Sequence, residues 1–416
     1  LIYLLLISLS GQQPRVVPIQ ERKADFLLQP PPLSPRPTVV EKRTEESRGS
    51  ISALKLVPPR RPYPGKAGIM LKVQANHFKV TFHPGENIYQ YDVDINPKIS
   101  SKGMARMLER QLIEIYGSEL NGKLPVYDGS KSMYTHGPLP FQHREFVVTL
   151  AEDRGTSGRE KKFTVTIRHV STLNRNNLED FLKGRPVPTP QEHLQALDVL
   201  LREHPALHFT SVSRSFFKKE LGSAPLEGGL VAINGFYQSL RPTHNGLQLN
   251  VDLSTTAFHA SIPVIDFLKK QFKNFDPRYR LTDVVRLKVK RALSRLKVQV
   301  IHRQTPRRYR ISGLSTGPTK DLKFPMEGGE EMRVVDYFKA TYNCVIEYPE
   351  LPCLQVQANK ASYLPMEVCV ICDGQKYGGK LNDRQTKNLR DLACVLPRVR
   401  ESKILSIMNK DDGPGR

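Results

Sequence analysis

Positive charge is concentrated in one short part of this 416-residue chain, and it limits how that part can fold. Residues 269–310 hold fifteen Lys and Arg against two acids, Asp276 and Asp283, which accounts for +13 of a formal net charge of +22. Because charged side chains are rarely buried without partners, the helices and strands of this segment must leave a basic face in solvent. We therefore predict amphipathic elements here, each with one basic side.

Aromatic residues lie at or just beyond the end of the basic segment, among them Tyr309, Phe324, Tyr337 and Tyr342. A basic surface attracts the phosphates of a nucleic acid, and aromatic rings stack on unpaired bases. The combination favours single-stranded nucleic acid as the partner. A solvated basic face without a ligand explains the composition equally well, so motifs must decide between the two.

The overall composition is that of an ordinary globular protein of two to four domains, with 39% hydrophobic and 25% charged residues. A pI near 9.8 favours nucleic acid or an anionic membrane as partner. The apolar residues 1–9 are too short to cross a bilayer, and no later run holds eighteen apolar residues. They are interpreted as the start of a fragment or the remnant of a signal segment.

The five cysteines all lie in the last quarter of the chain. Cys369 and Cys372 have the C-x-x-C spacing, but no second such pair completes the four ligands that zinc needs. Because they sit in an apolar run, they are predicted to be buried strand thiols. The odd number of cysteines favours a reducing compartment.

The first ordered unit is predicted at residues 65–185, after a Pro-rich, basic and disordered lead-in at residues 1–64. It is predicted to be a mixed α/β domain. Strand patterns at residues 68–82 and 88–95 flank an HPGEN turn and predict a hairpin. A helix capped by Ser100 or Ser101 follows. Its predicted buried face holds Met104, Leu108, Leu112 and Ile115.

Three further units complete a multidomain α+β chain. Residues 186–260 are predicted to be a β-rich linker, with a leading helix that starts at Thr189 or Pro190 and ends at His204. Residues 261–375 are predicted to form an OB-like small β-barrel with an α/β insertion. Residues 376–416 are predicted to be helical.

Several motifs resemble those of eukaryotic, plant-type Argonaute proteins. SRSFF at residues 213–217 and GFYQSLR at 235–241 are similar to the first linker of that family, and GQKY at 374–377 to its second linker. The motifs similar to its PAZ domain are KVQVIH at 297–302, RYRISGL at 308–314, LPCLQV at 351–356 and YLPMEVC at 363–369. The implied order is N-terminal domain, linker 1, PAZ and the start of linker 2, with the family's MID and PIWI domains absent from residues 1–416.

The resemblance implies a PAZ pocket for the two-nucleotide 3′ end of a small RNA. Such a pocket needs phosphate donors, an aromatic platform for a base and an apolar wall. The implied pocket residues are His302, Arg307, Tyr309, Phe324, Tyr337, Tyr342, Lys360 and Leu364. The expected RNA-backbone patch is Arg286, Lys288, Lys290, Arg291 and Arg308. The loop after His302 is one residue shorter than is usual, so Arg307 and Arg308 remain alternatives in the pocket; a core position is the alternative for His302 and Phe324.

The implied function is small-RNA binding in RNA-mediated gene silencing. No nucleophile–base pair or phosphate loop stands out, and the family's endonuclease needs a Mg²⁺-binding PIWI domain, so residues 1–416 are not expected to be an enzyme or to hold a cofactor. The expected partners are single-stranded or 3′-overhanging duplex RNA and other silencing-complex proteins, without a membrane, in the cytoplasm and secondarily the nucleus. The alternatives are a truncated guide-directed endonuclease and a structural interaction protein that binds no RNA.

Overall fold

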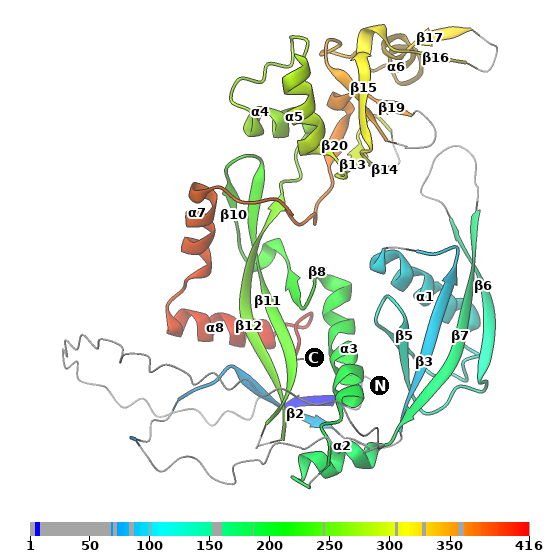
Figure 1. Cartoon of the computed structure of the whole chain (residues 1–416), viewed down its shortest axis with the longest axis vertical. Coiled ribbons are helices and arrows are strands. Elements are labelled where there is room, and N and C mark those ends of the chain that lie inside the picture. Colours follow the sequence, from blue (N-terminus) through cyan, green and yellow to red (C-terminus); the bar gives the residue numbers. More distant parts are fainter. Residues whose placement is uncertain are drawn as a thin grey trace, which may run out of the picture.

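The computed structural model describes residues 5–8, 68–69, 73–82, 87–99, 101–151, 160–185, 187–243, 246–303, 307–326, 330–356 and 362–415. A long antiparallel hairpin runs through the middle of the molecule, with an N-terminal sheet on one side and a smaller α/β unit beyond one end (Figure 1). The predicted multidomain α+β class is confirmed.

The N-terminal unit is a five-stranded antiparallel sheet in the order β4-β5-β3-β7-β6. Its strands are β3 (Ile88–Asn96), β4 (Val126–Tyr127), β5 (Ser132–His136), β6 (His143–Ala151) and β7 (Glu160–Leu173). The sheet buries one face against helix α1, and this packing forms a core of its own.

Helix α1 (Lys102–Tyr116) begins as predicted, because the Ser101 hydroxyl accepts a hydrogen bond from the backbone N–H of Met104 at 3.4 Å. The predicted buried face is only half right. Leu108 and Leu112 are buried together with Ala105, whereas Met104 and Ile115 are 44% and 51% exposed. The sheet covers only a narrow stripe of the helix, and the outer positions of the apolar pattern fall beyond it.

The predicted hairpin of the two first strands is wrong. Strand β2 (His77–Phe82) does not pair with β3 but joins the central sheet beside β12, with Leu249 opposite Phe78. Strand β1 (Leu5–Ser8), from the range predicted to be disordered, pairs with the other edge of β2. The alternating pattern shows which residues face a hydrophobic core, but it does not show which of several cores they face. Val80 of β2 belongs to the core of the central sheet, together with Leu247 and Leu249.

The central hairpin consists of β11 (Leu230–Thr243) and β12 (Gly246–His259), paired over their full length. Strands β9 (Ser215–Phe217) and β10 (Ser223–Leu226) pair with β11, and β8 (Thr210–Val212) pairs with the outer edge of β9. Helix α3 (Gln191–His208) lies beside this sheet and continues past the predicted end at His204, because Pro205 is buried within its packed last turn.

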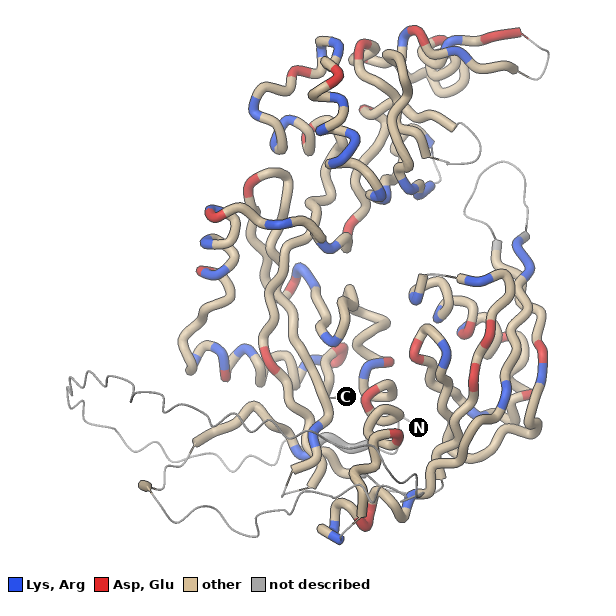
Figure 2. The backbone as a smooth tube through the Cα atoms, in the orientation of Figure 1, with Lys and Arg blue, Asp and Glu red and all other residues tan. Residues whose placement is uncertain are grey.

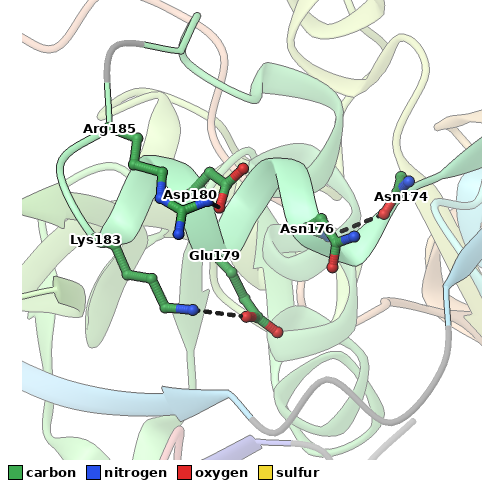
Figure 3. A network of polar contacts seen from close by, with 6 residues as sticks. All are labelled: Asn174, Asn176, Glu179, Asp180, Lys183 and Arg185. Atoms are coloured by element: carbon green, nitrogen blue, oxygen red, sulfur yellow. Dashed lines mark hydrogen bonds and ion pairs between the residues drawn. The ribbon is translucent and has the colours of Figure 1, made fainter.

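Helix α2 (Arg175–Leu182), which precedes α3, was not predicted. Its buried residues are Leu178 and Phe181, too few for a clear periodic signal. Figure 3 shows the polar contacts that stabilise it, which are the Asn174 cap to the N–H of Asn176 at 3.0 Å and the ion pairs Lys183–Glu179 at 3.1 Å and Arg185–Asp180 at 2.7 Å.

The third unit surrounds a separate core of buried aliphatic residues. Two helices, α4 (Val264–Gln271) and α5 (Asp283–Leu293), precede two three-stranded sheets. The first sheet holds β13 (Lys297–Val300), β14 (Arg308–Arg310) and β20 (Cys369–Ile371), and the second β15 (Gly313–Pro318), β18 (Pro352–Gln355) and β19 (Tyr363–Leu364). The predicted small barrel is thus built from two sheets, and the described residues show no closed ladder of strands.

The predicted α/β insertion consists of the hairpin β16 (Lys323–Pro325) and β17 (Glu331–Arg333), followed by helix α6 (Val334–Tyr342). At the end of the chain, α7 (Asp383–Ala393) and α8 (Pro397–Met408) lie along the central hairpin (Figure 1). Arg400 of α8 holds Asp252 of β12 by two hydrogen bonds of 2.7 and 2.8 Å.

Candidate nucleic-acid interface

A pocket of about 250 Å³ opens between the β16–β17 hairpin, helix α6 and strand β19. Its lining residues are Arg303, Tyr309, Leu322, Lys323, Phe324, Val334, Tyr337, Phe338, Tyr342, Ser362, Tyr363 and Leu364. None of them is acidic, and two are cations. Six are aromatic, and aromatic rings are the surfaces on which bases stack, so the chemistry suits a nucleotide with its phosphate.

Helix α6 brings two tyrosine hydroxyls together. Tyr337 and Tyr342 are five residues apart, yet their hydroxyl oxygens lie 3.5 Å from each other. Tyr342 is the last residue of the helix, and Asn343 ends it in the left-handed region with φ of 49°. Burial raises the pKa of the Tyr342 hydroxyl above its usual value of 10, so it keeps its proton at neutral pH and can donate.

Phe324 of β16 forms one wall of the pocket. Its ring centroid is 5.2 Å from that of Tyr337, with an interplanar angle of 88°, and the side chain is half-buried. This edge-to-face contact holds the ring in one orientation and leaves part of it accessible. Phe324 therefore belongs both to the edge of the core and to the pocket.

His302 and Arg303 follow strand β13 and lie behind the tyrosines. The His302 ring packs edge-on against Tyr342 at 4.6 Å and Phe338 at 5.0 Å. Arg303 donates from Nε to His302 Nε2 at 3.2 Å and from a terminal nitrogen to the Tyr342 hydroxyl at 2.7 Å. Its guanidinium carbon is 5.3 Å from the Tyr342 ring centroid.

Burial, aided by the adjacent Arg303, lowers the pKa of His302 to about 4. His302 is therefore neutral at pH 7, which agrees with Nε2 accepting the hydrogen bond from Arg303. Since the folded-state pKa lies below the ordinary value of 6.5, protonation favours the unfolded state. The contribution of His302 to stability is complete above pH 6.5 and is lost as the pH falls toward 4.

We expect a histidine-selective NMR titration to give His302 a midpoint near pH 4 rather than 6.5. In Arg303→Gln the midpoint should rise part of the way, because a neighbouring positive charge is removed while most of the burial remains. A His302 midpoint at or above 6.5 would contradict the buried, Arg303-bound geometry.

The structure brings together most of the residues assigned to the 3′-end pocket. Tyr309, Phe324, Tyr337, Tyr342 and Leu364 line it, and His302 packs directly behind Tyr342. The backbone carbonyl of Arg307 accepts a hydrogen bond from Val300 N–H at 3.0 Å, and neither Arg307 nor Arg308 lines the pocket. Lys360 lies outside the described residues.

Arg303 was missed from the sequence, although it directly follows His302. The shortened loop after β13 was the available signal, because a shorter loop brings its first residues closer to the pocket. Lys323 also lines the pocket and was not singled out.

The expected backbone patch is mostly exposed. Lys288, Lys290 and Arg291 on α5 and Arg308 on β14 are exposed. Arg286 differs, since its guanidinium donates to the Ser315 carbonyl at 2.6 Å, which ties α5 to β15. Figure 2 shows Lys and Arg along the side of this unit that is turned toward the linker and the N-terminal sheet.

The prediction of two buried strand thiols is right for Cys369 and wrong for Cys372, which lies just beyond the strand. Cys369 is fully buried in β20, Cys372 follows it half-buried, and burial raises the pKa of both thiols. Within the described residues no group of three or more His, Cys, Asp or Glu side chains is placed to hold a metal ion. In the same part of the chain, every helix is too short or too polar to cross a membrane.

Together, the fold and the pocket define a PAZ-containing protein. Family models match residues 70–201 as the N-terminal domain of argonaute, 211–260 as the Argonaute linker 1 domain and 265–390 as the PAZ domain. The chain belongs to the Argonaute family, and these matches give it the family's N-terminal, linker 1 and PAZ domains in that order.

Plant Argonautes are among the relatives of this chain. Protein argonaute 1C of Oryza sativa subsp. japonica is 44% identical over 92% of this chain and 38% of its own length. Protein argonaute 10 of Arabidopsis thaliana is 42% identical over 83% of this chain and 36% of its own length. The chain thus spans a little over a third of these relatives.

Solved structures of the family are also similar to the chain. Kluyveromyces polysporus Argonaute with a guide RNA is 16% identical, covers 79% of this chain and 40% of its own, and has a TM-score of 0.48. The Drosophila Argonaute PAZ domain in complex with 3′-end 2′-O-methylated RNA is 29% identical, covers 27% of this chain and all of its own, and has a TM-score of 0.25.

Proposed function

We propose that this chain binds small RNA in RNA-mediated gene silencing, with the PAZ pocket holding the 3′ end of the guide. The observation that carries the proposal is the pairing of two tyrosine hydroxyls, 3.5 Å apart, with a cation at 2.7 Å in a pocket without acidic lining residues. Such a cluster of donors suits a phosphate, and membership of the Argonaute family supports RNA as its source.

Some pocket residues contact the phosphate and others contact the bases. The hydroxyls of Tyr337 and Tyr342 donate to phosphate oxygens, and His302 holds Tyr342 in place. Phe324 and Tyr309 offer ring faces to the terminal bases, and Leu364 is the apolar wall that ends the site. Arg307 and Lys360 remain proposed contacts of the RNA 3′ end.

The exposed basic patch is proposed to follow the RNA backbone. Lys288, Lys290, Arg291 and Arg308 have the exposure that this role requires, whereas Arg286 is engaged with the Ser315 carbonyl. Phosphate contacts of this kind add affinity without sequence preference. The patch therefore contributes affinity, and the pocket contributes recognition of the end.

The decisive experiment compares a duplex carrying a two-nucleotide 3′ overhang with the same duplex blunt-ended. The purified chain should bind the overhang more tightly in direct competition. Equal affinity for both ends would remove the case for a 3′-end pocket. A chain without RNA affinity at moderate salt would instead favour the structural interaction protein.

We expect the RNA affinity to fall steeply with salt. Each phosphate neutralised by a clustered Lys or Arg releases condensed counterions, which gives a log–log slope of about −0.7 per phosphate on single strands. The measurement is a dissociation constant at several KCl concentrations. An affinity that stays constant between low and physiological ionic strength would rule out a role for the basic patch.

We expect the purified chain of residues 1–416 to cleave no RNA in Mg²⁺ or Mn²⁺. The three family models match its N-terminal, linker 1 and PAZ regions, and the described residues hold no group of carboxylates and histidines placed to bind metal. A guide-loaded cleavage assay on a complementary target tests this. A single-position cut by this chain would support the guide-directed endonuclease instead.

The proposed setting is the cytoplasm, with the nucleus second, in a complex with other silencing proteins. The five cysteines are free thiols in this structure, which suits a reducing compartment. The proposed domain limits are residues 65–185, 186–260, 261–375 and 376–416. A limited proteolysis map should place its first cuts between these units.

A further inference from the structure

Arg303 lines the PAZ pocket, and no carboxylate in the described part of the chain neutralises its charge. Its two hydrogen bonds go to the neutral His302 ring and to the Tyr342 hydroxyl. Among the described residues, no Asp or Glu lies within ion-pair distance of it, whereas Arg400 and Arg333 each pair with a carboxylate. A half-buried guanidinium bonded only to neutral groups retains most of its attraction for an anion.

The two bonds also fix where the guanidinium points. A guanidinium has five N–H groups, and the bonds from Nε and from one terminal nitrogen leave three of them. The fork between the terminal nitrogens needs one N–H from each of them, and two of the three remaining groups can supply it; this fork matches two oxygens of one phosphate. The Tyr342 hydroxyl accepts from Arg303, so its own hydrogen can turn from the Tyr337 hydroxyl, 3.5 Å away, to the same phosphate.

We propose that Arg303 binds the last internucleotide phosphate of the RNA 3′ end through this fork, with His302 and Tyr342 as the groups that position it. The inference rests on the proposed 3′-end function and adds to it a residue that recognises the negative charge of the phosphodiester. His302 acts in its neutral form, since only an unprotonated Nε2 can accept from Arg303.

The test is a thermodynamic cycle that combines one substitution in the protein with one chemical change in the RNA. Wild type and Arg303→Gln are each measured with the 3′-overhang duplex, once natural and once with a neutral methylphosphonate as its last linkage. On natural RNA we expect Arg303→Gln to lose about tenfold to hundredfold in affinity. The methylphosphonate should cost wild type a similar factor, and it should cost Arg303→Gln less than about threefold.

Controls separate this contact from other effects of charge and folding. Lys339 is exposed on α6 and absent from the pocket lining, so Lys339→Gln should lose the same factor as wild type on the methylphosphonate. Arg303→Lys keeps the charge without the fork and should fall between wild type and Arg303→Gln. If Arg303→Gln fails to fold by thermal denaturation, the same cycle is run with Arg303→Lys.

The proposal is overturned if the methylphosphonate lowers the affinity of Arg303→Gln by the same factor as that of wild type. Arg303 then acts only by holding His302 and Tyr342. A wild-type protein that does not distinguish overhang from blunt ends contradicts the proposed function itself, before Arg303 is tested. A wild type that prefers the overhang but is insensitive to the methylphosphonate leaves the proposed function standing and removes the role of Arg303.

Discussion

Replacing Gly235 with alanine is expected to open the central sheet and to destabilise it by about 3 kcal/mol or more. Gly235 is buried in β11, between β9 and β12, opposite Phe217 and Ser254. A Cβ atom built there would lie 2.0 Å from the Phe216 carbonyl oxygen and 2.8 Å from the Phe217 ring. Backbone cannot yield as a flexible side chain can, so β9 must separate from β11.

The measurement is hydrogen exchange followed by mass spectrometry on the whole chain. Peptides that cover β11 and β12 should lose about 100-fold in protection, since each 1.4 kcal/mol corresponds to a factor of ten. Peptides from α4 and β13 should change little, because they belong to a separate core. Gly378→Ala is the matched control, since its Cβ would meet no atom within 4 Å. Unchanged protection of β11 in Gly235→Ala would contradict the close contact.

The sequence predicted single elements better than their partners. A cap and an apolar repeat are local, so Ser101 and Leu108 predicted helix α1 correctly. Pairing depends on residues far along the chain. The strand at His77–Phe82 therefore looked like half of a hairpin with β3, while its actual neighbour is β12, about 170 residues away.

In the pocket, too, the sequence predicted some residues and missed those that depend on long-range contacts. The sequence motifs singled out Phe324, Tyr337 and Tyr342, which the structure brings into one pocket. They did not reveal Arg303, because its place in the pocket depends on a tertiary contact with Tyr342 of α6. Arg286 looked like an ordinary member of the basic patch, and only the packing of α5 on β15 gives it the bond to Ser315.

Tyr337→Phe and Tyr342→Phe are expected to abolish much of the preference for a 3′ overhang. Each change removes one hydroxyl and keeps the ring, and a donor to a charged acceptor is worth about 1–3 kcal/mol. Tyr342→Phe should have the larger effect, because that hydroxyl also accepts the 2.7 Å bond from Arg303. The measurement is the ratio of affinities for overhanging and blunt duplexes.

Phe324→Ala should lower the same ratio by removing a stacking surface, worth about 1–3 kcal/mol per base. It also removes a ring packed 5.2 Å from Tyr337, so part of its effect can come from a displaced tyrosine. The two tyrosine changes are therefore the cleaner test, because the rings and their packing stay in place.

Lys290→Ala is the control for the tyrosine changes. Lys290 is exposed on α5 and is absent from the pocket lining, so its loss should weaken overhanging and blunt duplexes by the same factor. The tyrosine variants should change the ratio, and the lysine variant should change only the absolute affinities. If both tyrosine variants keep the overhang preference of wild type while remaining folded, their hydroxyls do not bind the terminal phosphate. The 3′ end would then have to be held elsewhere on the chain.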